Sequence, residues 1–245
     1  METTTHSGAA GVSDRGSRRG VNADAMALTT AGSWTIGVVC DGVSMAPRAD
    51  RAARVAAETG ARVLATRLRE GTLPEYALGE AAALAGRAVA ALAGTESVAP
   101  ACTYVAGIAS AEGVWAAGIG DSRAHWIPDE GPGMVLTEDD ADEHDVLTAW
   151  LGAGAGEPAP RVRSYRPAVP GRLMLCTDGL WRCLPGFAEG GGARAIHDRG
   201  SVVVAELLDD ARSLVGRALD AGGHDNITVV LIPVTPGAPT RSDSG

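Results

Sequence analysis

The chain has 245 residues, 45% of them hydrophobic, which is enough for one domain with a substantial core. Its formal net charge of −9 argues against nucleic acid as the main ligand. The sequence has no apolar run of about 18 residues, and its polar N-terminus lacks the apolar region of a signal peptide. Three of the four cysteines lie in apolar runs and none forms a Cys-x-x-Cys pair, which is typical of reduced thiols. We therefore expect a cytoplasmic protein that binds neither nucleic acid nor a membrane.

One domain is predicted at residues 11–234, between a disordered N-terminus at 1–10 and a disordered tail at 235–245. Hydrophobic periodicity and turn residues predict both helices and strands. The predicted strands are at about 25–28, 34–40, 102–109, 114–119, 123–127, 134–136, 161–165, 172–177 and 227–234. The predicted helices are at about 48–70, from about 72 to 93, at 146–151 (a short one) and at about 202–221.

The order of these elements indicates the fold class. The links within residues 102–127 are so short that we expect the three strands there to pair as an antiparallel meander. Residues 72–75, Thr-Leu-Pro-Glu, have the form of a capping box with an early proline, which predicts the start of the second helix. Few strand-helix-strand units alternate, so the pattern predicts an α+β fold with antiparallel sheets and helices packed outside them.

Two polar segments each allow a structural and a functional interpretation. Residues 11–24 carry arginines and aspartates, either as a solvated loop, which is the ordinary case, or as an anion-binding arginine beside a metal-site carboxylate. The acidic run at 138–145 resembles a calcium loop in composition. It lacks the glycine and the spacing of an EF-hand, so we interpret it as a solvated loop.

Carboxylates recur where apolar strands meet turns, at Asp41, Asp121, Asp178 and Asp225. Each alone could be an ordinary turn residue, but four together, with Asp24 as a fifth, indicate a site for a hard cation. An all-oxygen cluster selects Mg²⁺ or Mn²⁺, and the histidines share no spacing that would suit zinc. Two such cations would lower the pKa of a water molecule and stabilise an in-line displacement at phosphorus.

A competing pattern lies at residues 176–182, which fit the Cys-x2-Gly-x2-Arg phosphate loop of cysteine-dependent phosphatases. That loop needs a thiolate, Cys176, and backbone N–H groups around a dianion. Asp178 inside the cradle would repel both the thiolate and the phosphate. Leu175 also stands where a histidine usually precedes the cysteine. We interpret the match as accidental.

A set of motifs spans residues 11–234 in a fixed order: Arg19 with Asn22-Ala23-Asp24, Asp41-Gly42, Ala101-Cys102-Thr103, Gly120-Asp121-Ser122-Arg123, Leu136-Thr137-Glu138-Asp139, Leu151-Gly152, Thr177-Asp178-Gly179-Leu180-Trp181, and Asp225-Asn226-Ile227-Thr228. Taken together, they resemble the metal-dependent type 2C (PPM-type) serine/threonine protein phosphatases, in a bacterial-like form. The resemblance implies a four-layer αββα sandwich of two antiparallel sheets flanked by helices. It also implies hydrolysis of phosphoserine and phosphothreonine in proteins, opposing a bacterial kinase, with two Mn²⁺ or Mg²⁺ ions.

The resemblance also implies a role for each site residue. Asp41 would bridge the two cations, with Gly42 adding its backbone carbonyl, and Asp178 and Asp225 would complete the first cation. Asp24 would orient the attacking water. In addition, Arg19 would bind the substrate phosphate, and Asp121 together with Asp178 would hold a third, weaker cation.

Three departures from the family pattern affect the expected activity. Ala23 replaces an acid or amide beside the second cation, and Val43 offers no proton donor where some members carry a histidine. Only about ten residues separate Asp139 from Leu151, so we expect a shortened flap, an open site and weak sequence selectivity. The alternative is a catalytically weak pseudophosphatase that acts as a partner-binding regulatory module.

Overall fold

The computed structural model describes residues 1–94, 99–157, 159–184 and 204–237, and places most strands in two antiparallel sheets. In spatial order, the six-stranded sheet contains β1 (Glu2–His6), β2 (Ala9–Asp14), β13 (Ile227–Val234), β12 (Gly171–Cys176), β8 (Arg123–Pro128) and β9 (Met134–Val135). The five-stranded sheet contains β11 (Arg161–Tyr165), β7 (Gly113–Ile119), β6 (Tyr104–Ser110), β4 (Trp34–Asp41) and β3 (Asp24–Ala31). A two-residue pair joins β5 (Ala101–Cys102) to β10 (Leu151–Gly152).

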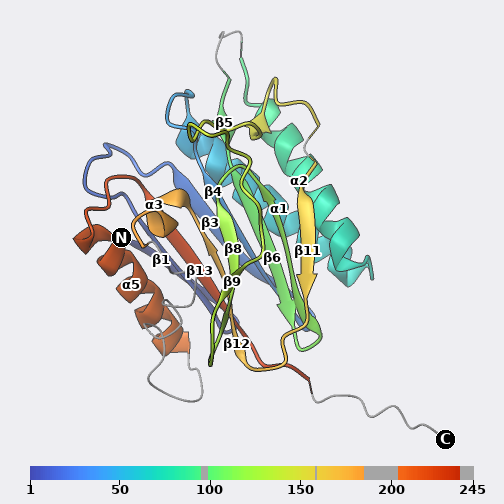
Figure 1. Cartoon of the computed structure of the whole chain (residues 1–245). Helices are drawn as coiled ribbons and strands as arrows, with labels where there is room; N and C mark the ends of the chain where they lie inside the picture. Colours follow the sequence, from blue (N-terminus) through green and yellow to red (C-terminus); the bar gives the residue numbers. More distant parts are fainter. Residues whose placement is uncertain (95–98, 158, 185–203, 238–245) are drawn as a thin grey trace, which may run out of the picture.

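Helices cover the outer faces of both sheets (Figure 1). The five-stranded sheet is covered by α1 (Ala49–Arg69) and α2 (Pro74–Ala90), and the six-stranded sheet by α5 (Val204–Asp220). One apolar cluster lies between the two sheets, and one lies under the helices on each side. The predicted α+β, four-layer αββα sandwich is therefore confirmed.

Small residues allow the helix layer to lie close to its sheet. The buried face of α1 includes Ala52, Ala53, Ala56 and Ala57, which recur at helical spacing. Because these side chains are short, the core on this side is built from many small contacts and few aromatic rings. The packed helix begins directly after the loop that follows β4, so its N-terminal end lies near the tip of that strand.

The predicted meander is wrong in its third strand. β6 and β7 pair as expected, but β8 pairs with β12 and β9 in the other sheet. The chain crosses at the turn that contains Gly120, which has a φ of +94°, and a Cβ at this position would lie 2.7 Å from Cγ2 of Thr103. Glycine is therefore required both by the backbone conformation and by the close approach. The crossing places Asp121 at the seam between the sheets.

Two further predictions are wrong. Residues 1–10, predicted to be disordered, form β1 and the start of β2, because all five residues of β1 pair with Ala9–Ser13 of β2 as an edge strand. Residues 146–151 form no helix: Leu147 makes a bridge with Ala141, and Leu151 begins β10. The bend at 142–146 is closed by Asp142, whose carboxylate accepts from the N–H groups of His144 and Val146.

The remaining elements agree with the sequence to within a few residues, and β11 is the edge strand that was predicted. The second helix, α2, begins at Pro74, so the early proline that was predicted is confirmed. The predicted capping box is wrong, because the residue at the cap position is Leu73, whose side chain makes no capping hydrogen bond. The tail at 235–245 lies mostly outside the described residues; within the described part, Gly237 donates its N–H to the carbonyl of Ala111. Among the described helices, none is long and apolar enough to cross a membrane.

Candidate active site

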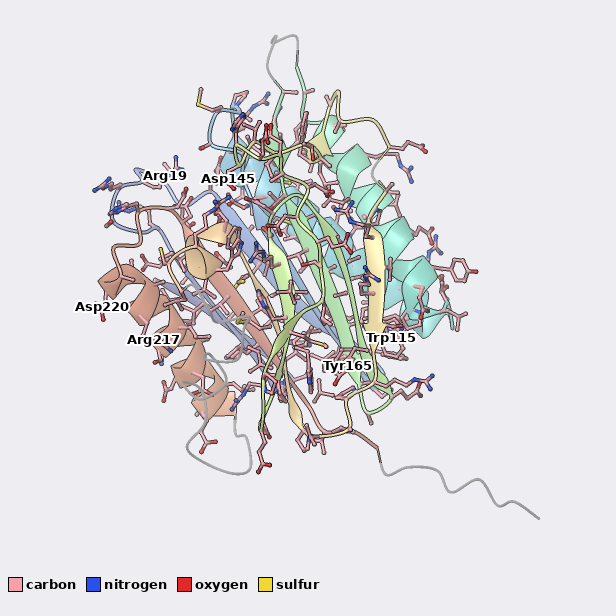
Figure 2. All side chains as sticks on the ribbon, in the orientation of Figure 1. Arg19, Trp115, Asp145, Tyr165, Arg217 and Asp220 are labelled. Carbon is pink, nitrogen blue, oxygen red and sulfur yellow. The ribbon has the colours of Figure 1, made fainter. Side chains whose placement is uncertain are left out.

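A pocket of about 440 Å³ opens at one end of the sandwich, where the carboxyl ends of β4 and β12 meet the start of β13. Figure 2 shows Arg19 and Asp145 at this end, whereas Trp115 and Tyr165 lie towards the other. The walls of the pocket combine most of the predicted site residues with several that were not predicted: Arg19, Gly20, Val21, Ala23, Asp41, Gly42, Val43, Ser44, Ala49, Asp50, Thr103, Asp121, Asp145, Leu147, Asp178, Arg182, Asp225 and Asn226.

Asp41 is fixed at the tip of β4 by a buried hydroxyl pair. Its N–H donates to Oγ1 of Thr103 at 2.9 Å, and the N–H of Thr103 donates to the Asp41 carbonyl at 2.8 Å. Oγ1 of Thr103 also lies 2.8 Å from Oγ of Ser122, in the crossing turn. The same network thus connects β4 with the turn that carries Asp121. Neither hydroxyl was assigned a role from the sequence.

Gly42 follows Asp41 at the end of β4, and backbone hydrogen bonds hold this part of the chain in place. Its N–H donates to the carbonyl of Ala23, and the next N–H, that of Val43, donates to the carbonyl of Ala101. A Cβ at Gly42 would lie 2.5 Å from the carbonyl oxygen of Ala49, at the start of α1. Only glycine therefore fits at this position, because a side chain would collide with the backbone at the start of α1.

Asp24 lies directly behind Asp41, because the two residues are register partners in β3 and β4. Asp24 is buried and is not part of the pocket wall; it borders a second cavity near the N-terminus. Its Oδ2 accepts hydrogen bonds from Oγ1 of Thr177 at 2.9 Å and of Thr228 at 2.7 Å. Its Oδ1 is buried and has no hydrogen-bond partner among the described residues. Asp24 therefore lies behind Asp41, outside the pocket wall.

Asp178 and Asp225 come from the neighbouring strands β12 and β13 of the other sheet. Asp178 begins the short helix α3 (Asp178–Trp181) directly after β12, and Asp225 lies just before β13. Asn226 joins this corner to the N-terminal loop: its Oδ1 accepts from the N–H of Ala23, and its Nδ2 donates to the carbonyls of Arg15 and Val21. The loop that carries Arg19 is thereby held against the start of β13.

Arg19 forms a two-pronged ion pair with Asp225, with Nε to Oδ1 at 2.7 Å and Nη2 to Oδ2 at 2.5 Å. The loop reaches this position through Gly16, which has a φ of +74°. A Cβ at Gly16 would lie 1.8 Å from the carbonyl oxygen of Asp225, so no side chain fits here. Both side chains are more than a third exposed, so the pair is accessible from solvent.

Arg182 and Asp145 are site residues that the sequence interpretation missed. Arg182 follows α3 and contacts three carboxylates: Asp178 at 3.0 Å, Asp145 at 3.2 Å and Asp121 at 3.3 Å. Asp145 belongs to the acidic run that was predicted to be only a solvated loop. The Cys-x2-Gly-x2-Arg pattern drew attention to Arg182, but for a different chemistry.

The clustered carboxylates disfavour one another's ionisation. Burial, together with the charge of Asp178, raises the pKa of Asp24 to about 7, while the two threonine hydroxyls oppose this rise. Burial and the charges of Asp24 and Asp178 raise the pKa of Asp41 well above its usual value. Burial and Asp178 raise the pKa of Asp121 to about 6, against the lowering influence of Arg182. A site in which carboxylates are hard to ionise is suited to binding a cation.

The donor chemistry of the pocket fits hard divalent cations, although the side chains do not surround such an ion. The available donors are carboxylate and backbone oxygens, and Oδ1 of Asp178, like that of Asp24, is buried with no hydrogen-bond partner among the described residues. In the described part of the chain, no group of three or more His, Cys, Asp or Glu side chains is arranged to hold a metal ion. The physical reason lies in the ion pairs: Arg19 engages Asp225, and Arg182 engages Asp121 and Asp178.

The cysteine-phosphatase interpretation does not fit the structure. Cys176 is the last residue of β12 and is completely buried. Burial raises the pKa of its thiol far above the usual range, so it is not a thiolate at neutral pH. It is also absent from the pocket wall. The Cys-x2-Gly-x2-Arg match is therefore accidental, as proposed.

Comparison with known proteins identifies the family. A family model described as "Protein phosphatase 2C" matches residues 13–208. No curated protein matches the chain at a significant level.

Solved structures of bacterial phosphatases share the fold. The serine/threonine phosphatase Stp1 from Staphylococcus aureus is 21% identical with a TM-score of 0.76, over 97% of this chain and 98% of that one. MsPP from Mycobacterium smegmatis, a PPM Ser-Thr phosphatase solved in complex with cacodylate, is 25% identical with a TM-score of 0.69, over 94% and 98%. The Mycobacterium tuberculosis phosphatase PstP/Ppp is 22% identical with a TM-score of 0.65, over 94% and 98%.

Proposed function

The chain belongs to the protein phosphatase 2C family and is a phosphoprotein phosphatase, and from this premise we propose that it hydrolyses phosphoserine and phosphothreonine with Mn²⁺ or Mg²⁺ bound in the pocket around Asp41. One observation carries the proposal: Asp41, Asp178 and Asp225, from three strand ends in two sheets, line the same pocket beside Arg19. The substrates would be proteins phosphorylated by a serine/threonine kinase.

Two divalent cations would be held by Asp41, the backbone carbonyl of Gly42, Asp178 and Asp225. When bound, the cations supply the Lewis-acid charge that activates water and neutralises the phosphoryl group. The network of Thr103 and Ser122 holds the backbone of Asp41 in place, so that its carboxylate need not be ordered on binding.

Arg19 would bind the substrate phosphate. In the structure both prongs of its guanidinium donate to Asp225, so Arg19 must leave Asp225 before it can donate to two phosphate oxygens. The exposure of both side chains makes this movement possible. MsPP, which shares the fold, was solved with cacodylate, an oxyanion.

Asp24 would orient the attacking water from beneath Asp41. Its Oδ2 is fully engaged by two hydroxyl donors, which favour the ionised carboxylate. Its Oδ1 has no hydrogen-bond partner among the described residues, so it is the oxygen that would accept a hydrogen bond from the attacking water. Val43 lines the pocket and has no proton to give, so we propose that the leaving group takes its proton from solvent.

The state of the cysteines is typical of a protein in a reducing environment. The four cysteines are free, three of them buried, and the structure contains no disulfide among them. We propose that the enzyme acts in the cytoplasm, where phosphorylated proteins would be its partners.

The test is hydrolysis of an aryl phosphate and of phosphoserine and phosphothreonine peptides, with Mn²⁺, with EDTA and with iodoacetamide. We expect activity that needs Mn²⁺, withstands iodoacetamide and falls at least about 100-fold in Asp41→Asn. Asp220→Asn, which removes an exposed carboxylate at the end of α5, is the matched control and should leave the rate unchanged. Mn²⁺ binding without hydrolysis would favour the partner-binding pseudophosphatase instead.

A further inference from the structure

Arg182 connects three separate parts of the pocket. Its Nε contacts Oδ2 of Asp178 on its own helical turn, its Nη2 contacts Oδ2 of Asp121 in the crossing turn between β7 and β8, and its Nη1 contacts Oδ2 of Asp145 in the segment between β9 and β10. All three nitrogens of the guanidinium are thus engaged by carboxylates. The group lies where a third cation would have to lie if Asp121 and Asp178 were its ligands.

Neighbouring contacts hold this arrangement in place. The indole N–H of Trp181 donates to the carbonyl of Asp121 at 2.9 Å. The guanidinium carbons of Arg123 and Arg182 lie 3.5 Å and 4.5 Å from the centre of the Trp181 ring. Arg123 in turn forms a two-pronged ion pair with Asp139. Asp121 is therefore fixed through its backbone by Trp181 and through its side chain by Arg182.

The oxygens of Asp178 are divided between two uses. Oδ2 contacts Arg182, whereas Oδ1 is buried and has no hydrogen-bond partner among the described residues. Oδ1 thus remains for a cation that also binds Asp41 and Asp225, while Oδ2 is already paired with the positive charge of Arg182. Arg19 differs from Arg182, because the only pocket carboxylate it pairs with among the described residues is Asp225.

We propose that the guanidinium of Arg182 takes the place of a third divalent cation between Asp121 and Asp178, so that the pocket holds two cations. The same group fastens the segment at 138–148 over the pocket through Asp145. A third cation would have to displace a positive charge that three carboxylates hold. This inference rests on the proposed two-cation function, and it replaces the expectation that Asp121 with Asp178 binds a third metal.

The test counts bound Mn²⁺ per chain by equilibrium dialysis and metal analysis, up to saturating Mn²⁺. We expect two Mn²⁺ in the wild type, a third in Arg182→Ala, and two again when Asp121→Asn is added to Arg182→Ala. Arg182→Lys should keep two, because a positive charge remains. Arg212→Ala, which removes an arginine paired with Asp209 on α5, is the matched control and should also bind two.

The outcomes separate this inference from the proposed function. Three Mn²⁺ in the wild type, or no third ion in Arg182→Ala, overturns the role of Arg182 and leaves the two-cation phosphatase intact. A folded wild type that binds no Mn²⁺ overturns the proposed function and this inference with it. Circular dichroism confirms that each variant is folded, and Arg182→Gln replaces Arg182→Ala if the alanine variant is not.

Discussion

Asp24 shows how a carboxylate can be buried and still be kept ready to ionise. Burial raises its pKa, and the hydroxyls of Thr177 and Thr228 oppose this rise by donating to Oδ2, so that the pKa is about 7. Oγ1 of Thr177 also accepts from the N–H of Thr228, so the same hydroxyl holds the two central strands of the six-stranded sheet together. The threonine beside the second Asp-Gly is thus part of the site.

We predict that Thr177→Val lowers activity about 10- to 100-fold at neutral pH, the usual cost of losing a group that orients a functional carboxylate. Without the hydroxyl, ionised Asp24 is less stable, so its pKa rises and the acid limb of the pH–rate profile moves to higher pH. Thr177→Ser keeps the hydroxyl and should restore both the rate and the profile. A valine variant with an unshifted profile would show that Thr177 has only a structural role.

At the scale of elements, the sequence predicts strands better than it predicts their partners. The β3–β4 pair could be predicted because both strands are continuous and separated by a short turn. The sheet that receives β8 could not, because β8 is buried along nearly its whole length and lacks the alternation that would mark one face. The first ten residues were misassigned because a polar edge strand has the composition of a disordered segment.

The same distinction between local and long-range features holds for the residues of the candidate site. Asp41, Asp178 and Asp225 could be predicted because each marks the end or start of an apolar strand, which is a local feature of the sequence. Arg182 could not, because its contacts with Asp121 and Asp145 depend on how distant turns pack. Sequence spacing carries no signal for such contacts.

The segment at 138–148 is fastened to the sandwich by ion pairs. Arg123 grips Asp139 with Nε to Oδ1 at 2.9 Å and Nη2 to Oδ2 at 2.7 Å, and both side chains are less than a quarter exposed. Arg163 reaches Glu138 from β11, and Arg161 contacts Glu138 and Asp140. A partly buried, two-pronged pair is stronger than an exposed one.

We predict that Asp139→Asn lowers the free energy of unfolding by about 1–2 kcal/mol, because Arg123 loses a charged partner. Asp209→Asn on α5 is the control: the pair of Asp209 with Arg212 is a single exposed contact at 3.2 Å, so its loss should cost no more than about 0.5 kcal/mol. Chemical denaturation of both variants measures the difference. Equal losses would mean that the pair of Arg123 with Asp139 does not fasten the segment.

At the scale of the molecule, the site depends on both sheets. The five-stranded sheet supplies Asp24 and Asp41, Asp178 and Asp225 lie just after β12 and just before β13 of the six-stranded sheet, and Asp121 lies where the chain crosses between the sheets. Negative charge is therefore concentrated at the seam between the layers. Without cations, this concentration opposes the packing of one sheet on the other, so stability and cation binding are linked.

This linkage has a definite sign. The folded pKa of Asp24 is about 7 and that of Asp41 is raised well above its usual value, whereas both are near 3.9 in the unfolded chain. Between pH 6.5 and 8.5 the folded chain therefore holds protons that the unfolded chain has lost, so stability falls as pH rises. His125 acts in the opposite direction, because burial lowers its pKa to about 3, but its contribution is nearly complete by pH 6.5.

We therefore predict that, in EDTA, the free energy of unfolding falls by about 1–3 kcal/mol from pH 6.5 to pH 8.5, which follows from about 1.4 kcal/mol per pH unit for each proton retained. Added Mn²⁺ should stabilise the protein more at pH 8.5 than at pH 6.5, because the carboxylates must be ionised to bind it. Denaturant unfolding at both pH values, with and without Mn²⁺, measures both effects. Asp41→Asn should reduce the pH dependence and the gain from Mn²⁺ together, since one carboxylate is responsible for both. Stability that rises with pH in EDTA would contradict the burial of protonated carboxylates at the seam.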